Sequence, residues 1–272
     1  LTEEKKNIIT AVCDEVISGS LNEHFPLVVW QTGSGTQSNM NANEVIANRG
    51  NLIAGSKLLH PNDDINKSQS SNDTFPTAMH IAAVIAIEDH LFPAMDKLAA
   101  TLKRLEAENE GIVKSGRTHL QDAVPIAFSQ EISGWRAMIE KTRAQIELTL
   151  PSLKQLALGG TAVGTGLNAE PAYIKKVAET LSEVTGEKYV TADNMIDATN
   201  NTDGFSDVSS AMKTTALVLI KMANDFRLMA SGPRCGLNEL KLPKRQPGSS
   251  IMPGKINPVI PEVVNQVAFN II

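Results

Sequence analysis

One short stretch of the chain has the residue types of an anion-binding site. Residues 248–258, GSSIMPGKINP, hold two glycines and two prolines, a density that forbids a regular helix and predicts a shaped loop. Its side-chain donors belong to Ser249, Ser250, Lys255 and Asn257, and only the lysine is charged. Such a set fits an anionic oxygen ligand, because the neutral donors fix its geometry and the ammonium supplies charge. A flexible surface turn has a similar composition.

Two further segments place hydroxyls and amides just before an expected helix. These donors are Ser34, Thr36 and Asn39 in the first segment, and Ser70, Ser71 and Asn72 in the second. Backbone amides at the start of a helix bind anions, so both segments are candidate sites. The same residue types cap helices in most proteins, and capping alone explains either segment equally well.

His119 is the candidate acid or base. It lies among the polar residues 117–122, between a charged helix end and Pro125, where we expect a loop. Histidine is the side chain that titrates nearest neutral pH. His60 lies in a polar turn and is an intermediate candidate. We expect structural roles for the histidines that lack polar neighbours of this kind, which are His24, His80 and His90.

Together these segments fit a small dicarboxylate substrate. The chemistry would be proton abstraction next to a carboxylate, with the added negative charge stabilised by a preorganised loop. The glycine-rich residues 159–166 lack the lysine of a phosphate-binding loop, and no strand is expected before them, so we predict close packing at a turn and no nucleotide site. No spacing of His, Cys and carboxylates indicates zinc or iron, and no cofactor is expected.

Long helices are the elements that must position these residues. In residues 73–109, apolar side chains recur every seven residues, which predicts a helix with a bundle seam, kinked or broken at Pro93. Aromatic residues are only 4% of the chain, so helices packed on helices are favoured over a β-sandwich. Further helices are predicted at residues 2–18, 41–54, 126–156 with a break at Pro151, 171–184 and 204–230.

Composition excludes several classes of function. The net charge is −5 without a long basic run, which argues against a nucleic-acid partner. No uninterrupted apolar stretch reaches the ~20 residues that a membrane span needs. The two cysteines, Cys13 and Cys235, lie far apart and fit a reducing compartment.

These motifs resemble those of the fumarase/aspartase superfamily. Residues 248–258 resemble its signature loop. Five other stretches resemble the class II fumarases within it: TGSGTQSNMNANE at 32–44, HPNDDIN at 60–66, SQSSND at 68–73, GRTHLQDA at 116–123 and GGTAVGTGLN at 159–168. The agreement runs in order over nearly the whole chain.

The resemblance implies an all-α protein, a bundle of long helices whose central helices form a tetrameric core. Each active site of the homotetramer would combine loops of three subunits. Residues 1–68 would be the remainder of an N-terminal domain and residues 69–272 the central bundle domain. We expect a fragment, lacking an N-terminal segment and a C-terminal domain. A cytoplasmic location is expected, and a mitochondrial source stays open because a targeting peptide would precede residue 1.

The resemblance also implies roles for individual residues. Ser249 is similar to the serine that removes a proton beside a carboxylate, with its alkoxide stabilised by Lys255. His119 resembles the group that handles water, with Glu262 as its partner. The substrate carboxylates would be held by Ser34, Gly35, Thr36, Ser70, Ser71, Asn72, Thr118, Ser250, Lys255, Ile256 and Asn257. A second dicarboxylate site would consist of His60, Pro61, Asn62 and Asp63.

Two activities within the superfamily compete. Residues 32–38, 62–64 and 70–72 are similar to fumarases, which implies reversible hydration of fumarate to (S)-malate through an aci-carboxylate intermediate. Gln246 stands where fumarases have glutamate, and residues 236–239 and 258–266 are also similar to aspartases, so aspartate ammonia-lyase is the alternative. A structural role like that of the related crystallins is disfavoured, because such a role does not need Ser249, Lys255 and His119.

Overall fold

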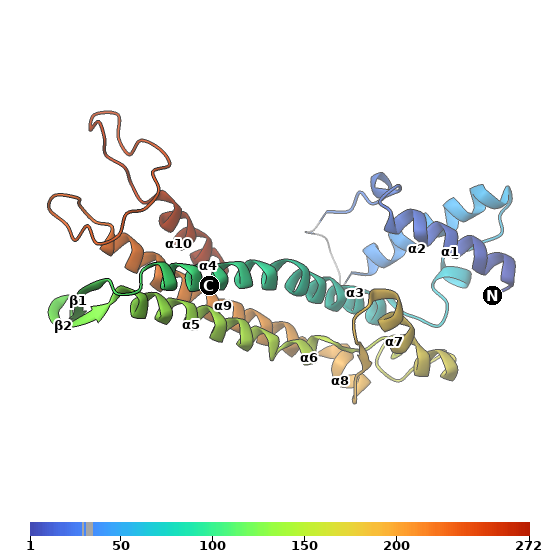
Figure 1. Ribbon diagram of the computed structural model, residues 1–272. Coiled ribbons are helices and arrows are strands. Elements are labelled where there is room, and N and C mark those ends of the chain that lie inside the picture. The colour runs from blue at the N-terminus through green and yellow to red at the C-terminus, as the bar shows by residue number, and fades with distance from the viewer. Residues whose placement is uncertain (29, 31–34) are drawn as a thin grey trace. The chain divides into compact units, whose positions relative to one another are not determined.

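The computed structural model describes residues 1–28, 30 and 35–272 and places most of them in helices (Figure 1). The chain divides into two compact units, each made of two separate stretches. Unit 1 contains Leu1–Ile85 and Pro151–Thr202, and unit 2 contains Ala86–Leu150 and Asp203–Ile272. The predicted all-α class is confirmed, while the predicted domain boundary after residue 68 stays a prediction.

Unit 1 is a group of short and medium helices. In chain order its elements are α1 (Glu3–Ile17), η1 (Asn22–His24), α2 (Thr36–Ala54), η2 (Pro61–Ile65), α3 (Ser71–Ile85), β3 (Gln155–Leu156), α7 (Pro171–Thr185), β4 (Val190–Thr191) and α8 (Met195–Asn200). α6 (Leu150–Leu153) spans the boundary between the units. β3 and β4 form a short parallel pair. α1 packs on α2, where Val12 and Ala47 are fully buried.

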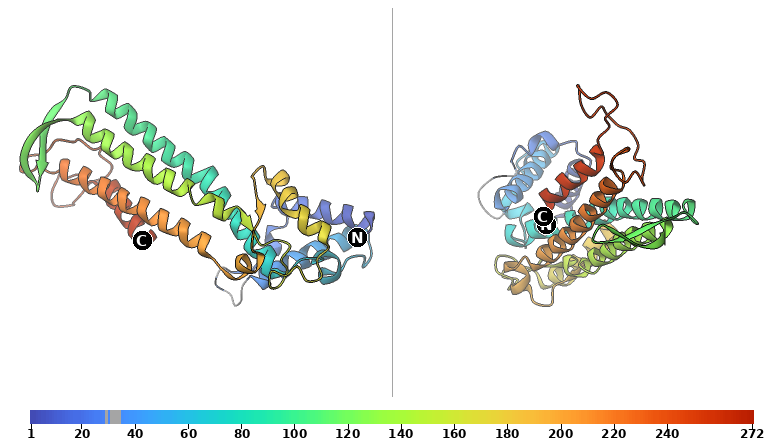
Figure 2. Two further views of the ribbon diagram at one scale, coloured as in Figure 1. Left: turned by 90° about the horizontal axis from the view of Figure 1, so that it is seen from below. Right: turned by 90° about the vertical axis from the view of Figure 1, so that its left-hand side faces the viewer.

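Unit 2 is a bundle of long helices. Its elements are η3 (Ala86–Leu91), α4 (Phe92–Glu108), β1 (Val113–Thr118), β2 (Gln121–Ala127), α5 (Phe128–Glu147), α9 (Asp203–Met229) and α10 (Val259–Ile271). α4 packs along α5, α5 along α9, and α9 along α10 (Figure 2). Ile132, Trp135, Ile139 and Ile146 recur on one face of α5 and form its core stripe. The Trp135 ring meets the Phe226 ring edge-on, with centroids 4.8 Å apart.

Most predicted helices are confirmed, and their ends differ for local reasons. The helix expected at residues 41–54 begins earlier, at Thr36, because Gly35 before it adopts a left-handed φ of 86°. The helix expected at 126–156 starts only at Phe128 and ends at Glu147, since residues 126 and 127 still belong to β2.

Pro93 does mark a break in the first long helix, as predicted. α3 passes into the π-helical turn η3, and α4 starts at Phe92 with the proline in its first turn. Proline has no backbone N–H, so the regular i→i−4 hydrogen bond is missing at this point. A π turn is one way in which a helix absorbs such a gap.

The loop expected at residues 117–122 is instead the tip of a β-hairpin. β1 and β2 are antiparallel, with Thr118 opposite Gln121 and a bulge between Gly116 and Arg117. The hairpin and residues 230–258 lie at the same end of the unit 2 bundle (Figures 1 and 2). His119 is therefore held on a defined turn and not on a free loop.

One helical stretch passes a simple test for a membrane span. Ser71–Glu108 is long and apolar enough by length and composition, and 22% of its most apolar window is buried inside the structure. Core helices of soluble proteins pass the same test, so this finding is weak support for a membrane role.

Candidate active site

Two of the predicted binding segments meet in unit 1. Asn39, in the first turn of α2, donates from Nδ2 to Ser71 Oγ at 2.8 Å. Its Oδ1 accepts a hydrogen bond of 3.0 Å from Thr74 Oγ1. The amide thus joins residues 35–39 to residues 70–74 within the unit.

Gly35 allows the two segments to approach closely. A Cβ atom at this position would lie 2.1 Å from the ring of Phe75 in α3, and the φ of 86° already disfavours other residues. Thr36 follows as the first residue of α2 and is exposed. Ser34, the other predicted binding residue here, lies outside the described residues.

Asp73 connects the serine segment to the glycine-rich turn. Its carboxylate is fully buried, and Oδ1 accepts from the Ser70 backbone N–H at 2.9 Å. Oδ2 accepts from the N–H groups of Gly159 at 3.1 Å and Thr161 at 2.9 Å. Burial raises the pKa of Asp73 above its ordinary value, while the backbone donors act in the opposite direction.

The role of Asp73 was missed at the sequence level, although a signal for it existed. Ser70 and Asp73 have the spacing of a capping box, in which the acidic residue bonds back to the N–H before the helix. The spacing does not predict the contact between Asp73 and Gly159, because the two residues are 86 positions apart.

The glycine-rich turn is a packing element, as predicted. A Cβ atom on Gly164 would lie 2.5 Å from the Met195 carbonyl oxygen, so α8 packs directly on its backbone. The expectation that no strand precedes the turn is wrong, because the two-residue strand β3 ends just before it. This strand pairs with β4 through two residues and does not change the role of the turn.

Asn72 lies where these three segments meet. Its Nδ2 donates to the Ala162 carbonyl at 3.0 Å. It also lines a cavity of about 370 Å³ together with Pro76, Ala162, Val163, Ile196, Thr199 and Asn200. The exposed Asn72 amide and the half-buried hydroxyls of Ser70 and Ser71 are thus held together at the start of α3.

The predicted second dicarboxylate site is a compact turn in unit 1. His60 caps η2, and its Nδ1 lies 3.3 Å from the backbone nitrogens of both Asn62 and Asp63. The same Nδ1 is 3.2 Å from the Asp63 carboxylate, a contact that requires a protonated ring. Capping and the ion pair therefore exclude one another. Pro61 occupies the first position of the turn.

In unit 2, His119 occupies the tip of the β1–β2 hairpin. His119 and Leu120 are its two central residues, with φ values of 53° and 63°. A two-residue turn with both φ values positive matches the twist of a hairpin, but it is uncommon for residues other than glycine, asparagine and aspartate. The exposed side chains of Thr118 and His119 are thus carried on a short, conformationally restricted turn.

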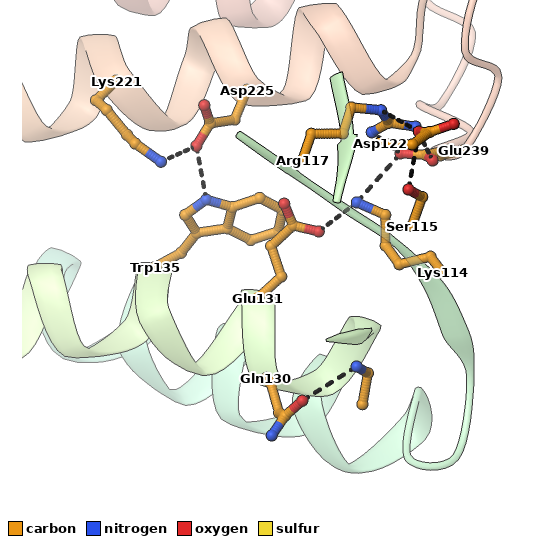
Figure 3. Close-up of polar contacts among 11 residues, drawn as sticks. Lys114, Ser115, Arg117, Asp122, Gln130, Glu131, Trp135, Lys221, Asp225 and Glu239 are labelled. Atoms are coloured by element: carbon orange, nitrogen blue, oxygen red, sulfur yellow. Dashed lines mark hydrogen bonds and ion pairs between the residues drawn. The ribbon is translucent and has the colours of Figure 1, made fainter. Parts of the chain in front are cut away.

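An ion-pair cluster lies beside this turn. Arg117 bonds to Glu239 through both guanidinium nitrogens Nη1 and Nη2, and Lys114 Nζ lies 3.2 Å from the same carboxylate (Figure 3). The Arg117 hydrogen bond is the main cause that lowers the pKa of Glu239, and the same bond raises the pKa of Arg117. Sequence reasoning missed Glu239 as a functional candidate.

Residues 248–257 form a small closed loop. The Gly248 backbone N–H donates to the Lys255 carbonyl at 2.8 Å. Ser249 Oγ accepts from the Ile251 N–H at 3.3 Å. Ser250, Lys255 and Ile256 are exposed, and Asn257 is half-buried. The side chains of Ser250 and Lys255 thus face the outside, on the shaped loop that the sequence predicts.

Glu262 lies in the first turn of α10, and its carboxylate is 4.0 Å from Arg227 Nη2. In the part of the chain that the structure describes, no hydrogen bond or ion pair joins it to His119. The pairing of these two side chains stays a prediction. The described residues also contain no cluster of three or more His, Cys, Asp or Glu side chains that could hold a metal ion.

Each unit therefore carries one part of the predicted site. Unit 1 brings together Gly35, Thr36, Ser70, Ser71 and Asn72, and separately the turn at residues 60–63. Unit 2 carries Thr118, His119, Glu262 and residues 248–257.

Comparisons with known proteins find relatives over the whole length of the chain. The family described as Lyase matches residues 1–272. The class II fumarate hydratase of Bacillus cereus is 55% identical over 271 residues, which are 98% of this chain and 59% of that protein. The class II fumarate hydratase of Campylobacter jejuni is 53% identical over 276 residues, covering 100% of this chain and 60% of that protein.

A solved structure shows the same fold. The crystal structure of recombinant class II fumarase from Schistosoma mansoni superposes with a TM-score of 0.96 at 40% identity, covering 100% of this chain and 61% of that one. The chain spans about 60% of the length of the curated relatives it matches.

Proposed function

The chain belongs to the lyase family, and on that premise we propose that the whole protein is a fumarate hydratase, which adds water reversibly to fumarate to give (S)-malate. The fumarate hydratases of Bacillus cereus and Campylobacter jejuni, at 55% and 53% identity, support this choice within the family.

The observation that carries the proposal is the loop at residues 248–257. It presents two hydroxyls, one ammonium and one amide on a frame closed by the Gly248–Lys255 hydrogen bond, and it contains no carboxylate. Such a loop binds an anionic oxygen ligand better than a neutral or cationic one. A C4 dicarboxylate offers two such groups.

In the proposed reaction, Ser249 acts as the base. In the direction from malate to fumarate, it removes a proton from the carbon next to a carboxylate, and the electron pair moves into that carboxylate to give the aci-carboxylate. The C–O bond at the neighbouring carbon then breaks, and His119 donates a proton so that water leaves. Hydration follows the same steps in reverse.

A serine hydroxyl is a weak base at neutral pH, so its alkoxide needs stabilisation. Lys255 and the backbone N–H groups of the loop supply positive charge and hydrogen bonds for it. The carboxylate that does not react would be held by the hydroxyls and amide of Ser70, Ser71 and Asn72, together with Thr36 and Thr118.

We further propose that the whole protein is a homotetramer with composite active sites. Large apolar side chains remain exposed on the helices of unit 2, and burying them between subunits would be favourable. They include Leu217, Leu228, Ile260, Val263, Val267 and Phe269.

Aspartate ammonia-lyase is the second candidate, and Gln246 just before the loop is the residue that favours it. The two activities differ in the group that is added to fumarate. A fumarate-consumption assay of the full-length protein, in buffer with and without ammonium, distinguishes them. We expect consumption without ammonium, and activity that requires ammonium would reject the hydratase.

The role of Ser249 is tested by Ser249→Ala in the full-length protein. Loss of the base should lower kcat by about 10²- to 10⁴-fold, the usual contribution of acid–base catalysis. Helix content by circular dichroism should not change, because the side chain is on a loop. Ser210→Ala on α9 is the matched control, since its hydroxyl donates to the Ser206 carbonyl one turn earlier in the same helix. Near-normal turnover of Ser249→Ala would remove Ser249 from the mechanism.

A further inference from the structure

Glu239 connects two segments of unit 2 that both carry proposed catalytic residues. Its carboxylate accepts two hydrogen bonds from Arg117, and the one from Nη1 to Oε2 is 3.1 Å long. Arg117 is in β1, two residues before His119, and Glu239 is ten residues before Ser249. The contact spans 122 positions of sequence and ties the hairpin to the segment that leads into the serine loop.

Lys114 reinforces this link from a second strand position. Its Nζ lies 3.2 Å from Glu239 and 2.7 Å from Glu131 in α5 (Figure 3). The charges thus alternate in sign from Arg117 through Glu239 and Lys114 to Glu131 in α5. Asp122, on the other strand, approaches Arg117 Nε at 3.7 Å.

The cluster is shielded enough for its geometry to matter. The side chains of Lys114, Arg117 and Glu239 are 12%, 18% and 19% exposed. Ion pairs on an open surface contribute little, whereas removing one partner from a shielded, hydrogen-bonded pair leaves the other charge without compensation. The two-fold contact between guanidinium and carboxylate also fixes their relative orientation.

The backbone around Glu239 is fixed independently of its side chain. Its N–H donates to the Met229 carbonyl at the end of α9 at 2.9 Å, and the Leu240 N–H donates to the same oxygen at 3.2 Å. The Asn238 N–H bonds to the Ser231 carbonyl at 2.9 Å. The carboxylate is therefore anchored on the end of α9, and the hairpin is held to that anchor through Arg117.

We infer that Glu239 is a positioning residue, which holds the hairpin of His119 and the lead-in to the Ser249 loop in a fixed relation within each subunit. The inference rests on the proposed hydratase function. Glu239 acts through Arg117 on the hairpin and through its own backbone on the loop, and it does not touch the substrate. Small misplacements of catalytic groups are costly, because the reacting atoms must lie within a few tenths of an ångström of the productive geometry.

The test uses Glu239→Gln in the full-length protein, a change that keeps the size of the side chain and removes its charge. The matched control is Glu106→Gln, which removes a carboxylate that pairs with Arg136 at 2.9 Å between α4 and α5 of the same unit. Steady-state kinetics with fumarate, thermal unfolding and backbone hydrogen exchange are measured for both variants.

We expect kcat of Glu239→Gln to fall about 10- to 100-fold, with a smaller change in KM. Amide exchange should become faster in residues 114–122, which lose their anchor, and stay unchanged in α4. Glu106→Gln should keep its kcat and the exchange of residues 114–122. If kcat and exchange of Glu239→Gln match those of the control, the inference is wrong.

A double variant separates positioning through Arg117 from a general loss of stability. If Glu239 acts through Arg117, then Arg117→Gln combined with Glu239→Gln should lower kcat no further than the more damaging single change. Multiplicative losses would show that the two side chains act independently and would overturn the inference.

The experiments can reject the hydratase function and the positioning role of Glu239 separately. A wild-type protein that does not hydrate fumarate rejects the hydratase, and hydrogen exchange then decides alone whether Glu239 holds the two segments together. A wild-type hydratase with an unaffected Glu239→Gln variant rejects only the role of Glu239.

Discussion

Asp73 and Glu239 are carboxylates that each hold a remote segment, but they do so in opposite environments. Asp73 is fully buried among backbone N–H groups, and burial raises its pKa. Glu239 is partly exposed among cations, and Arg117 lowers its pKa. By linkage, the contribution of Asp73 to stability is fully present below its ordinary pKa and is lost as the pH rises through its folded-state pKa. That of Glu239 is present above its ordinary pKa and is lost as the pH falls through its lowered folded-state pKa.

This difference predicts how Glu239→Gln depends on pH. At pH 7 the wild-type protein should unfold at a higher temperature than the variant, because only the wild type has the ion pair. The difference should shrink as the pH falls below the ordinary range of glutamate and through the lowered pKa of Glu239. Thermal unfolding of both proteins between pH 7 and pH 3 measures it. A difference that is constant with pH would mean that the carboxylate charge does not stabilise the fold.

Replacement of Asp73 tests the buried link in unit 1. Asp73→Asn keeps the shape but turns one acceptor into a donor, which then faces backbone N–H groups. We expect faster solvent exchange of either the Gly159 and Thr161 amides or the Ser70 amide, because the one carbonyl oxygen of asparagine can face only one of these two sides. Asp193→Asn, at an exposed position of the same unit, is the control and should leave all these amides unchanged. Unchanged exchange in Asp73→Asn would show that the turn is held by other contacts.

At the scale of elements, the serine loop depends on a glycine at its closing point. A Cβ atom on Gly248 would lie 2.8 Å from Asn257 Oδ1 and 2.9 Å from the Lys255 carbonyl oxygen, closer than real contacts allow. Gly248→Ala should therefore open the loop and reduce kcat/KM for fumarate by about 10-fold or more, since the donors lose their common frame.

Gly134→Ala is the control for this change. Gly134 is in α5, and nothing lies within 4 Å of a Cβ atom at this position. Alanine in a helix interior is more favourable than glycine by about 1 kcal/mol. We expect wild-type activity and slightly higher stability for the control. Equal kinetics for Gly248→Ala and the wild type would show that loop closure is unimportant.

Elements with a strong local signal were predictable from the sequence. Heptad spacing in residues 73–109 and alternating three- and four-residue spacing in residues 204–230 predicted the long helices, and Pro93 predicted the interruption between α3 and α4. The donor-rich loop at 248–258 was also predictable, because its glycines, prolines, serines and lysine all lie within eleven consecutive residues.

Elements that depend on distant contacts were not predictable. The β1–β2 hairpin has charged residues, glycine and proline in its strands, so it lacks the alternation that marks a strand. The link between Arg117 and Glu239 spans 122 positions and has no local pattern. The resemblance to a known family supplied the site residues, but not the side chains that hold them in place.

At the scale of the whole protein, the proposed composite sites predict complementation between inactive variants. Ser249→Ala and His119→Asn should each be inactive as pure proteins. If one active site takes these two residues from different subunits, mixed tetramers contain some sites with neither change. Co-refolding the two variants should then restore part of the activity, measured as fumarate consumption. Mixed tetramers without activity would show that each active site takes both residues from the same subunit.

The interleaved order of the two units has a consequence for synthesis on the ribosome. Residues 86–150 of unit 2 emerge before residues 151–202 complete unit 1, and α9 follows only after them. At about 5–20 residues per second, α5 waits some 3–10 seconds for α9, which packs along it. During that time α5 can pack on α4, but the Trp135 ring lacks its partner Phe226 in α9. A nascent chain of this protein is therefore expected to expose the apolar face of α5 for several seconds, and chaperones that bind apolar surface would recognise such a face.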